Sequence, residues 1–334
     1  MGVILGIEST AHTFSFGAVS SDGKDVLASH SSLYRPEEGG IHPREAADHH
    51  VESSRTLLER AILDWNVVKS DIDAVAFSQG PGLGPCLRVG GSVARSISMA
   101  LNIPLIGVNH CVAHIEIGRR MTGCIDPVLL YVSGGNTQVI ARASGRYRVL
   151  GETLDIGIGN MLDKFGRAIG IPFPGGPEIE RKAQSYIQNY GSDHILDLPY
   201  AVHGTDMAFS GILGAAIAHA KKGEDHGLVC HSLQEISFAS CVEVGERAMA
   251  LTGKKEILLG GGVACNKRIR TMTQTMASER GGSAYWPDWR LCIDNGTMIA
   301  ELGRRMLDAG INTSLSDSGI AVSYTHLTLP TSLA

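Results

Sequence analysis

Two histidines one helical turn apart are the clearest candidates for metal chemistry in this sequence. His110 and His114 follow the apolar run PLIGV, and the segment CVAHIEIGRRM reads as a helix with Asn109 as its N-cap. The i, i+4 spacing places both imidazoles on one helical face, where two nitrogens can bind one divalent ion. The alternative is a pair of helix-start histidines hydrogen-bonded to loops. Cys111 stands where the H-E-x-x-H metalloprotease pattern needs glutamate.

Three further residues are candidates for the same chemistry. Asp294 precedes an expected helix, where an aspartate is commonly a cap but could equally be a third, oxygen ligand for the metal. Glu8 and His12 lie in the polar loop after the first apolar run and are candidates for a general base.

Glycine-rich loops follow several apolar runs and could bind an anionic ligand. They are YVSGGNT at 131–137, PGGPEIE at 174–180 and GGGVACN at 260–266. Glycine allows a ligand to approach the backbone, and a strand-to-helix turn presents N–H groups to an anion. A plain hairpin loop, a helix start and close helix–strand packing are the structural alternatives. Neither a P-loop nor a dinucleotide-binding pattern is present.

An imperfect internal repeat positions these residues. Segments 3–29 and 128–153 each read as strand, polar loop, strand, turn and strand, and segments 74–108 and 256–286 as strand, Gly-rich loop, helix and strand. Two such α/β halves predict a ligand cleft between two lobes.

The expected domains follow from this repeat. Residues 1–125 form the first lobe and 126–295 the second, which carries most of the ligand loops, and a helix at 296–310 packs back on the first lobe. The tail at 316–334 ends in an uncharged run rich in Ser and Thr and is expected to be non-native, with a genuine edge strand as the alternative.

Composition limits the other classes of function. The formal charge of −5 over 334 residues is a poor match to a protein that binds nucleic acid alone, so a basic partner or a local patch is expected. Seven cysteines without a C-x-x-C pair favour a reducing cytoplasm over a disulfide framework. No apolar run is long enough to span a bilayer, so no membrane association is expected.

The motifs taken together resemble one family. GIESTAHTFSFG, GGIHPREAADHH, NHCVAHIEIGR, YVSGGNTQV, DKFGRAIG, FPGGPEIE, AFSGI, GGVACN and a final DNG occur in the order typical of the tRNA threonylcarbamoyladenosine transferases. The resemblance covers about residues 3–310 and is to the archaeal and eukaryotic form, the catalytic subunit of the KEOPS complex, formerly called O-sialoglycoprotein endopeptidase. It implies a two-lobed actin/hexokinase-like fold made of duplicated ribonuclease H-like halves.

The resemblance also implies residue roles. One divalent metal ion, iron or zinc, would be bound by His110, His114 and Asp294, with Tyr131 on or near it. The phosphate or acyl part of an adenine nucleotide ligand would contact the loop of Val132, Ser133, Gly134, Gly135 and Asn136. The nucleoside would contact Asp163, Gly176, Glu180 and Asn266. From the sequence alone, Asp163 beside Lys164 reads as an exposed ion pair.

The activity implied by the resemblance is transfer of the threonylcarbamoyl group from threonylcarbamoyl-adenylate to the exocyclic amine of adenosine 37 in tRNAs that read codons beginning with A. AMP would be released. The implied partners are tRNA, a small dimerising subunit, an atypical protein kinase subunit, which some relatives carry fused, and a further small subunit. An ATP-dependent kinase and a non-catalytic nucleotide-binding scaffold of the same fold are the alternatives.

Overall fold

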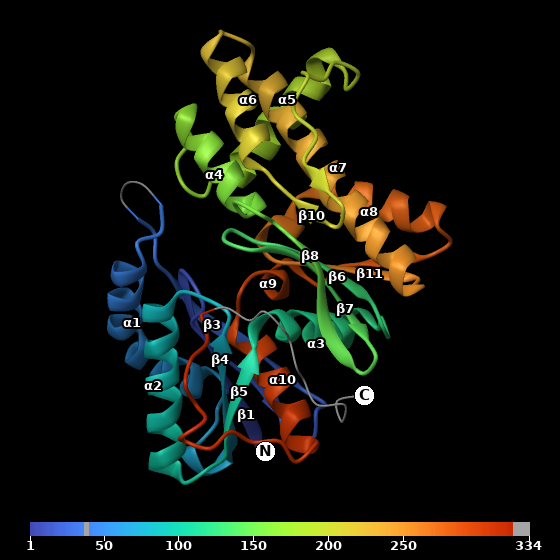
Figure 1. The fold of residues 1–334 in the computed structure, drawn as a ribbon. Helices are drawn as coiled ribbons and strands as arrows, with labels where there is room; N and C mark the ends of the chain where they lie inside the picture. Colours follow the sequence, from blue (N-terminus) through green and yellow to red (C-terminus); the bar gives the residue numbers. More distant parts are fainter. Residues whose placement is uncertain (37–39, 323–334) are drawn as a thin grey trace. The chain divides into compact units, whose positions relative to one another are not determined.

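The computed structural model describes residues 1–36 and 40–322, which fold as two compact units (Figure 1). Unit 1 comprises Met1–Met121 and the segment that begins at Ile293, and unit 2 comprises Thr122–Cys292. The first unit is therefore discontinuous in sequence.

A five-stranded mixed sheet forms the centre of unit 1. The strands are β1 (Val3–Glu8), β2 (Thr13–Ser20), β3 (Val26–Leu33), β4 (Ile72–Gly80) and β5 (Leu105–Asn109), in the order β3-β2-β1-β4-β5. The first three strands pair antiparallel, whereas β4 and β5 run parallel to β1. Every residue of β1 and β2 is buried, as expected for strands that are covered on both faces.

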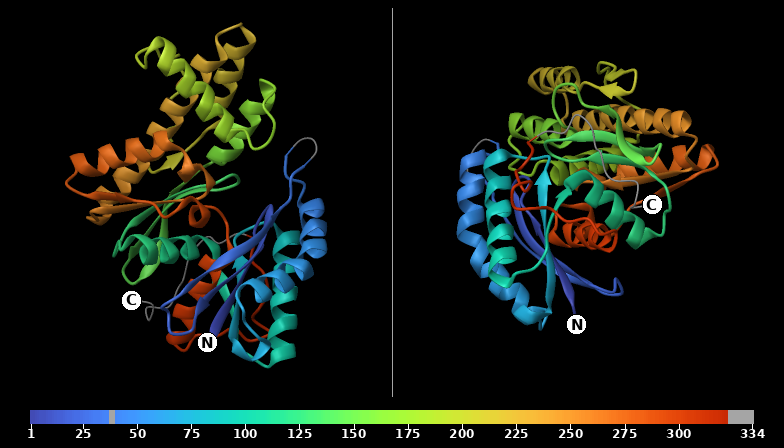
Figure 2. Two further views of the ribbon diagram at one scale, coloured as in Figure 1. Left: turned by 180° about the vertical axis from the view of Figure 1, so that it is seen from behind. Right: turned by 60° about the horizontal axis from the view of Figure 1, so that its bottom comes forward.

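Helices cover the two faces of this sheet (Figure 2). On one face, α1 (Pro43–Asp64) and α2 (Gly84–Leu101) enclose a core that includes Leu5 and Ile7 of β1. Alternate residues of a strand point to opposite faces, so Gly6 and Glu8 belong to the other face, where α10 (Gly296–Asp308) packs on β1 and β2. Helix α3 (His110–Thr122) begins directly after β5.

Unit 2 repeats the same strand order. Its sheet is β12-β11-β6-β7-β8, made of β6 (Val128–Val132), β7 (Thr137–Ala143), β8 (Arg146–Glu152), β11 (Glu256–Gly260) and β12 (Ser283–Tyr285). Helix α8 (Lys267–Glu279) joins β11 to β12 as α2 joins β4 to β5. Each strand of the first sheet thus has a counterpart, which confirms the duplicated α/β prediction.

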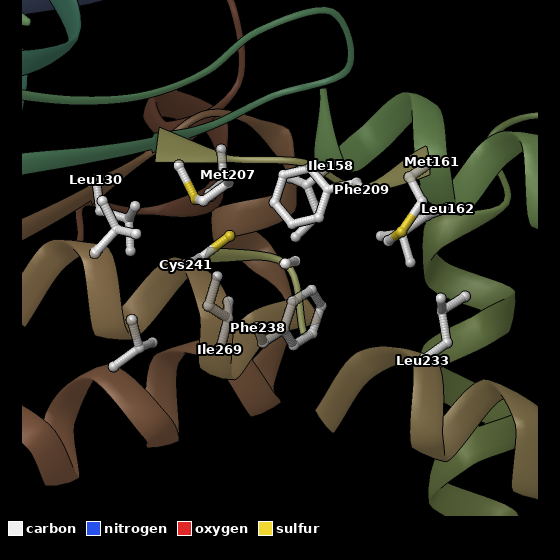
Figure 3. Close-up of a cluster of buried hydrophobic side chains, with 14 of the residues drawn as sticks. Leu130, Ile158, Met161, Leu162, Met207, Phe209, Leu233, Phe238, Cys241 and Ile269 are labelled. Atoms are coloured by element: carbon white, nitrogen blue, oxygen red, sulfur yellow. The ribbon is translucent and has the colours of Figure 1, made fainter. Parts of the chain in front are cut away.

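The remaining helices of unit 2 build its core (Figure 3). They are α4 (Ile158–Ala168), α5 (Gly176–Tyr190), α6 (Ser210–Lys221), α7 (His226–Thr252) and the short α9 (Trp289–Cys292). A small hairpin of β9 (Val202–His203) and β10 (Asp206–Met207) also belongs to this unit. Short 3-10 helices lie at Gly262–Cys265 in unit 2 and at Lys69–Asp71 in unit 1. Side chains from β6, β10, α7 and α8 meet in one cluster, including Leu130, Met207, Phe238 and Ile269. No helix among the described residues combines the length and apolar character that a membrane span requires.

Part of the expected tail packs on unit 1. Gln79 donates from Nε2 to the carbonyl oxygens of Asp317 and Gly319, at 2.9 and 2.7 Å. Arg95 donates to the carbonyl oxygen of Ser318 at 3.0 Å, and the Ser318 side chain is buried. Residues 323–334 of that expected tail lie outside the described residues.

Candidate functional site

Three side chains of unit 1 converge on one point. The Nε2 atoms of His110 and His114 each lie 3.3 Å from Oδ1 of Asp294, and one ligand atom from each residue lies within 4.8 Å of the other two. Both histidines are almost fully buried. Two imidazole nitrogens and a carboxylate oxygen are donors that suit zinc or iron. The residues present therefore fit a divalent metal ion.

The start of α3 presents the two histidines. The Oδ1 atom of Asn109 accepts a hydrogen bond from the backbone N–H of Val112 at 3.1 Å, which confirms Asn109 as the predicted N-cap. The helix begins at His110, so His114 follows one turn later on the same face. The rings meet nearly edge to face, with centroids 4.9 Å apart.

Asp294 is available as a ligand because its neighbour caps the helix. The Oδ1 atom of Asn295 accepts from the backbone N–H of Met298 at 2.9 Å, so the capping position that the sequence left open belongs to Asn295. Asp294 lies one residue earlier, and its carboxylate reaches the histidines instead.

Glycines fix the start of α10 on the sheet. A Cβ atom on Gly17 would lie 2.0 Å from the backbone nitrogen of Thr297, and one on Gly6 would lie 2.1 Å from the carbonyl oxygen of Gly296. Gly6 and Gly17 are register partners in β1 and β2, so together they create a flat surface for the first turn of α10. This close approach sets the position from which Asp294 extends.

Glu8 orients His110 from the side opposite the metal position. Its Oε2 atom lies 3.0 Å from Nδ1 of His110, and its Oε1 atom accepts from the backbone N–H and the hydroxyl of Thr10, at 2.6 and 2.5 Å. Because a carboxylate can only accept, Nδ1 of His110 donates to Glu8, and this arrangement would leave Nε2 as the nitrogen that binds a metal ion. This geometry favours a positioning role for Glu8 over the expected role of general base.

The surroundings of His114 and Asp294 lower the pKa values of both side chains. Burial lowers the pKa of His114 below its usual value, which keeps the imidazole neutral at neutral pH. Burial opposes the ionisation of Asp294, but the charge of His110 and the hydrogen bonds from both histidines hold its pKa well below the usual range. A neutral imidazole and an ionised carboxylate are the forms that bind metal.

The structure places His12, the other candidate base, in the loop between β1 and β2. Its carbonyl oxygen accepts from the backbone N–H of Tyr34 at 2.8 Å. A catalytic role for His12 stays a prediction.

In unit 2, the loop between β6 and β7 is a tight turn packed on a helix start. The backbone N–H and the hydroxyl of Ser133 both donate to the carbonyl oxygen of Asn136, at 3.0 and 2.9 Å. The carbonyl oxygens of Ser133 and Gly134 accept from the first turn of α4. A Cβ atom on Gly135 would have nothing within 4 Å, so this backbone is open to a ligand. The preceding Tyr131 and Val132 are buried in β6, and the expected role of Tyr131 at the metal stays a prediction.

The predicted nucleoside contacts lie in α4, in the first turns of α5 and at the N-cap of α8. Asp163 accepts from the backbone N–H of Gly175 at 2.7 Å, so its carboxylate ties α4 to the loop before Gly176, the first residue of α5. This contact replaces the exposed ion pair with Lys164 that the sequence suggested.

The start of α8 brings Glu180 and Asn266 together. Glu180 of α5 accepts from the backbone N–H of Lys267 at 2.8 Å, while Asn266 accepts from the N–H of Arg268 at 2.8 Å. The side-chain N–H of Asn266 also donates to Oε1 of Gln234 at 2.6 Å. Both residues therefore make hydrogen bonds that stabilise the start of α8, and their contacts with a nucleotide stay predictions.

Two residues that orient site side chains, Thr10 and Gln234, are not among the candidates that the sequence indicates. Thr10 holds Glu8, and its position two residues later is a local signal that could have been used. Gln234 orients Asn266 from α7, and nothing in the sequence links the two.

Comparison with known proteins identifies the family. The sequence model described as TsaD, tRNA N6-adenosine threonylcarbamoyltransferase, matches residues 25–301. The chain belongs to the tRNA N6-adenosine threonylcarbamoyltransferase family. A member of that name from Thermococcus sibiricus is 50% identical over 320 residues, which cover 95% of this chain and 95% of the relative.

Other relatives of this transferase family are longer. A probable bifunctional tRNA threonylcarbamoyladenosine biosynthesis protein from Thermoplasma acidophilum is 53% identical over 318 residues, which cover 95% of this chain but 59% of the relative. The chain thus spans about three fifths of the length of that protein. Among solved structures, nucleotide-bound HypF aligns over 92% of this chain and 47% of its own with a TM-score of 0.62 at 13% identity, which shows a shared fold.

Proposed function

We propose that this chain transfers the threonylcarbamoyl group from threonylcarbamoyl-adenylate to the exocyclic amine of adenosine 37 in tRNAs that read codons beginning with A. The observation that carries the proposal is the convergence of His110, His114 and Asp294 in a chain of this transferase family. A divalent ion bound there, iron or zinc, would polarise the transferred carbonyl as a Lewis acid.

The residues of unit 1 have defined tasks in this scheme. His110, His114 and Asp294 would hold the ion, and Glu8 accepts from Nδ1 of His110, whose Nε2 faces Asp294. Glu8 is committed to two bonds from Thr10, so we leave the general base to His12. A neutral His114 and an ionised Asp294 are the forms in which these two side chains would bind the ion, which would replace the contact between them.

The loops of unit 2 would bind the adenylate. We assign the acyl phosphate to the backbone of Val132, Ser133, Gly134, Gly135 and Asn136, where the N-terminal end of α4 adds a favourable dipole. The nucleoside contacts would come from Asp163, Gly176, Glu180 and Asn266.

The proposed reaction balances without a redox partner. The amine nitrogen of the adenine forms a bond with the carbamoyl carbon, while the bond from that carbon to the phosphate oxygen breaks. AMP leaves with the electron pair, and the amine loses one proton. N–H groups that face the developing oxyanion would each be worth roughly 100–1000-fold in rate.

We further propose that the chain works with tRNA and with KEOPS partner subunits in the cytoplasm. The net charge of −5 is unfavourable for binding a polyanion. Arg119 and Arg120, one of the basic clusters in the sequence, are engaged with Glu116 and Glu301. The relatives described as bifunctional support a close association with a second activity, for which we propose the kinase subunit.

The test is metal analysis of the purified chain together with a tRNA modification assay, with and without partner subunits. The proposal expects one bound ion per chain and modified adenosine that forms only when threonylcarbamoyl-adenylate is present. An ATP-dependent kinase would instead phosphorylate a small substrate with soluble Mg²⁺ and no resident ion. A scaffold would give no turnover in any mixture.

A further inference from the structure

A buried group of opposite charges joins α3 to α10 beyond the metal ligands. Arg120 of α3 pairs with Glu301 of α10, and Arg305 of α10 pairs with Glu116 of α3 at 2.9 Å. Each helix thus supplies one cation to a carboxylate of the other. We call these four residues the helix clasp. The Glu301 side chain is 0% exposed and that of Glu116 is 2% exposed, while Arg120 and Arg305 are 13% and 28% exposed, so solvent screens these pairs less than pairs on the surface.

The same two helices supply the metal ligands. His110 and His114 belong to the first turns of α3, and Asp294 lies just before α10. Two elements that must meet to form the triad are therefore joined a second time by the clasp. A shift of either helix would change the distances from Asp294 to the histidines and break buried ion pairs at the same time.

We infer that the helix clasp sets metal affinity by holding the histidine face of α3 in register with Asp294, a role that rests on the proposed metal centre. Arg305 has the central position, since its Nε donates to Glu301 at 2.9 Å while its Nη1 reaches Glu116. A planar guanidinium can bridge two carboxylates in this way, whereas a lysine ammonium lacks the matching fork of donors.

One ion pair of the clasp can be removed while each buried carboxylate keeps another cationic partner. Glu116 also accepts from Arg119 of its own helix at 3.0 Å, and Glu301 also accepts from Arg304 at 3.0 Å. Arg305→Met therefore keeps a cation beside each carboxylate while it removes the link from α10 to Glu116. Removing all partners would instead leave an uncompensated buried charge, which commonly unfolds a protein.

The experiment measures zinc and iron(II) affinity by competition with a chelator in the wild-type chain, Arg305→Met and Arg120→Met. Residues that orient ligands from outside typically change metal affinity by about 10–100-fold, and we expect a loss in this range for Arg305→Met with one ion still bound at saturation. Asp308→Asn is the matched control, because Asp308 is 57% exposed and its ion pair is with Arg304 of its own helix.

Two results would overturn the inference, and they are distinct. Wild-type affinity in both arginine variants, with a lowered melting temperature of the metal-free form, would make the clasp a purely structural feature. Absence of bound metal in the wild-type chain would remove the metal centre itself. Arg120 also donates to the carbonyl oxygen of Gly23, so Arg120→Met removes a further bond and can fail to fold. In that case the metal affinity of Arg305→Met is the deciding measurement.

Discussion

The Oδ1 atom of Asp294 lies 3.3 Å from Nε2 of His114, although 180 residues separate them in the chain. Helix periodicity alone brings His110 and His114 together, but nothing local specifies their carboxylate partner. The fold supplies it through the cap at Asn295 and the glycine contacts of α10.

Removing an inner ligand should abolish tight metal binding. His114→Ala deletes one nitrogen donor and should lower zinc affinity by more than about 100-fold, beyond the range that outer residues typically reach. Circular dichroism would check that the fold is kept. His203→Ala, at an exposed histidine of β9, is the control, and equal metal content in the two variants would remove His114 from the ligand set.

Glu8→Gln separates positioning from base catalysis. The amide keeps the shape but not the charge that holds the proton on Nδ1 of His110, so metal affinity should fall by about 10–100-fold. A general base would give a different result, namely a lower kcat with unchanged metal affinity. Metal titration and turnover at saturating metal distinguish the two.

Gly17→Ala should disturb the start of α10. The new methyl group would overlap the backbone of Thr297, and overpacking of this kind costs about 1–3 kcal/mol in the free energy of unfolding. Metal affinity should fall as well, because Asp294 shifts with the helix. Denaturant unfolding measures the first effect. Gly214→Ala in α6, where a Cβ would meet nothing within 4 Å, should not destabilise the chain.

His50 should make the protein sensitive to acid. Its Nε2–H donates to the carbonyl oxygen of Ala11 at 3.0 Å, and burial lowers its pKa to about 4, from 6.5. The unfolded chain therefore binds a proton on His50 at a higher pH than the folded chain does. The stability that the neutral, buried His50 contributes is present in full above pH 6.5 and is lost as the pH falls toward 4. The loss is at most on the order of 3 kcal/mol.

The measurement is the free energy of unfolding of the wild-type chain and of His50→Gln between pH 7 and pH 4. The variant should lose less stability over this interval. Parallel curves for the two proteins would contradict the assignment.

Glu180→Ala should weaken the binding of adenine nucleotides. Removing its carboxylate deletes a proposed nucleoside contact and the bond that holds the start of α8. Glu178→Ala is the control, since Glu178 lies in the same helical turn but pairs with Arg181 in solvent. Isothermal titration with AMP would show the difference, and equal affinities would leave Glu180 with the structural role alone.

Periodic and local features were predictable from the sequence, whereas long-range partners were not. The alternation of apolar residues predicted both sheets, and Asn109 was recognised as a cap because capping depends on neighbours only. His50 is buried against Phe14 of β2, a contact between distant segments that local spacing does not reveal. Arg119 and Arg120 form a basic cluster in the sequence, but they pair with Glu116 and Glu301 in the structure. Glu301 belongs to a distant helix, so spacing along the chain does not reveal its pairing with Arg120.

The discontinuity of unit 1 orders events during synthesis. Residues Met1–Met121 contain both histidines, but α10, which packs on Gly6 and Gly17 of the sheet, is made only after unit 2. At about 5–20 residues per second, translation of unit 2 delays that helix by on the order of ten seconds or more. A nascent chain therefore has an incomplete ligand set for this period. The carboxylate of the proposed metal site thus joins the histidine pair only after the whole of unit 2 has been synthesised.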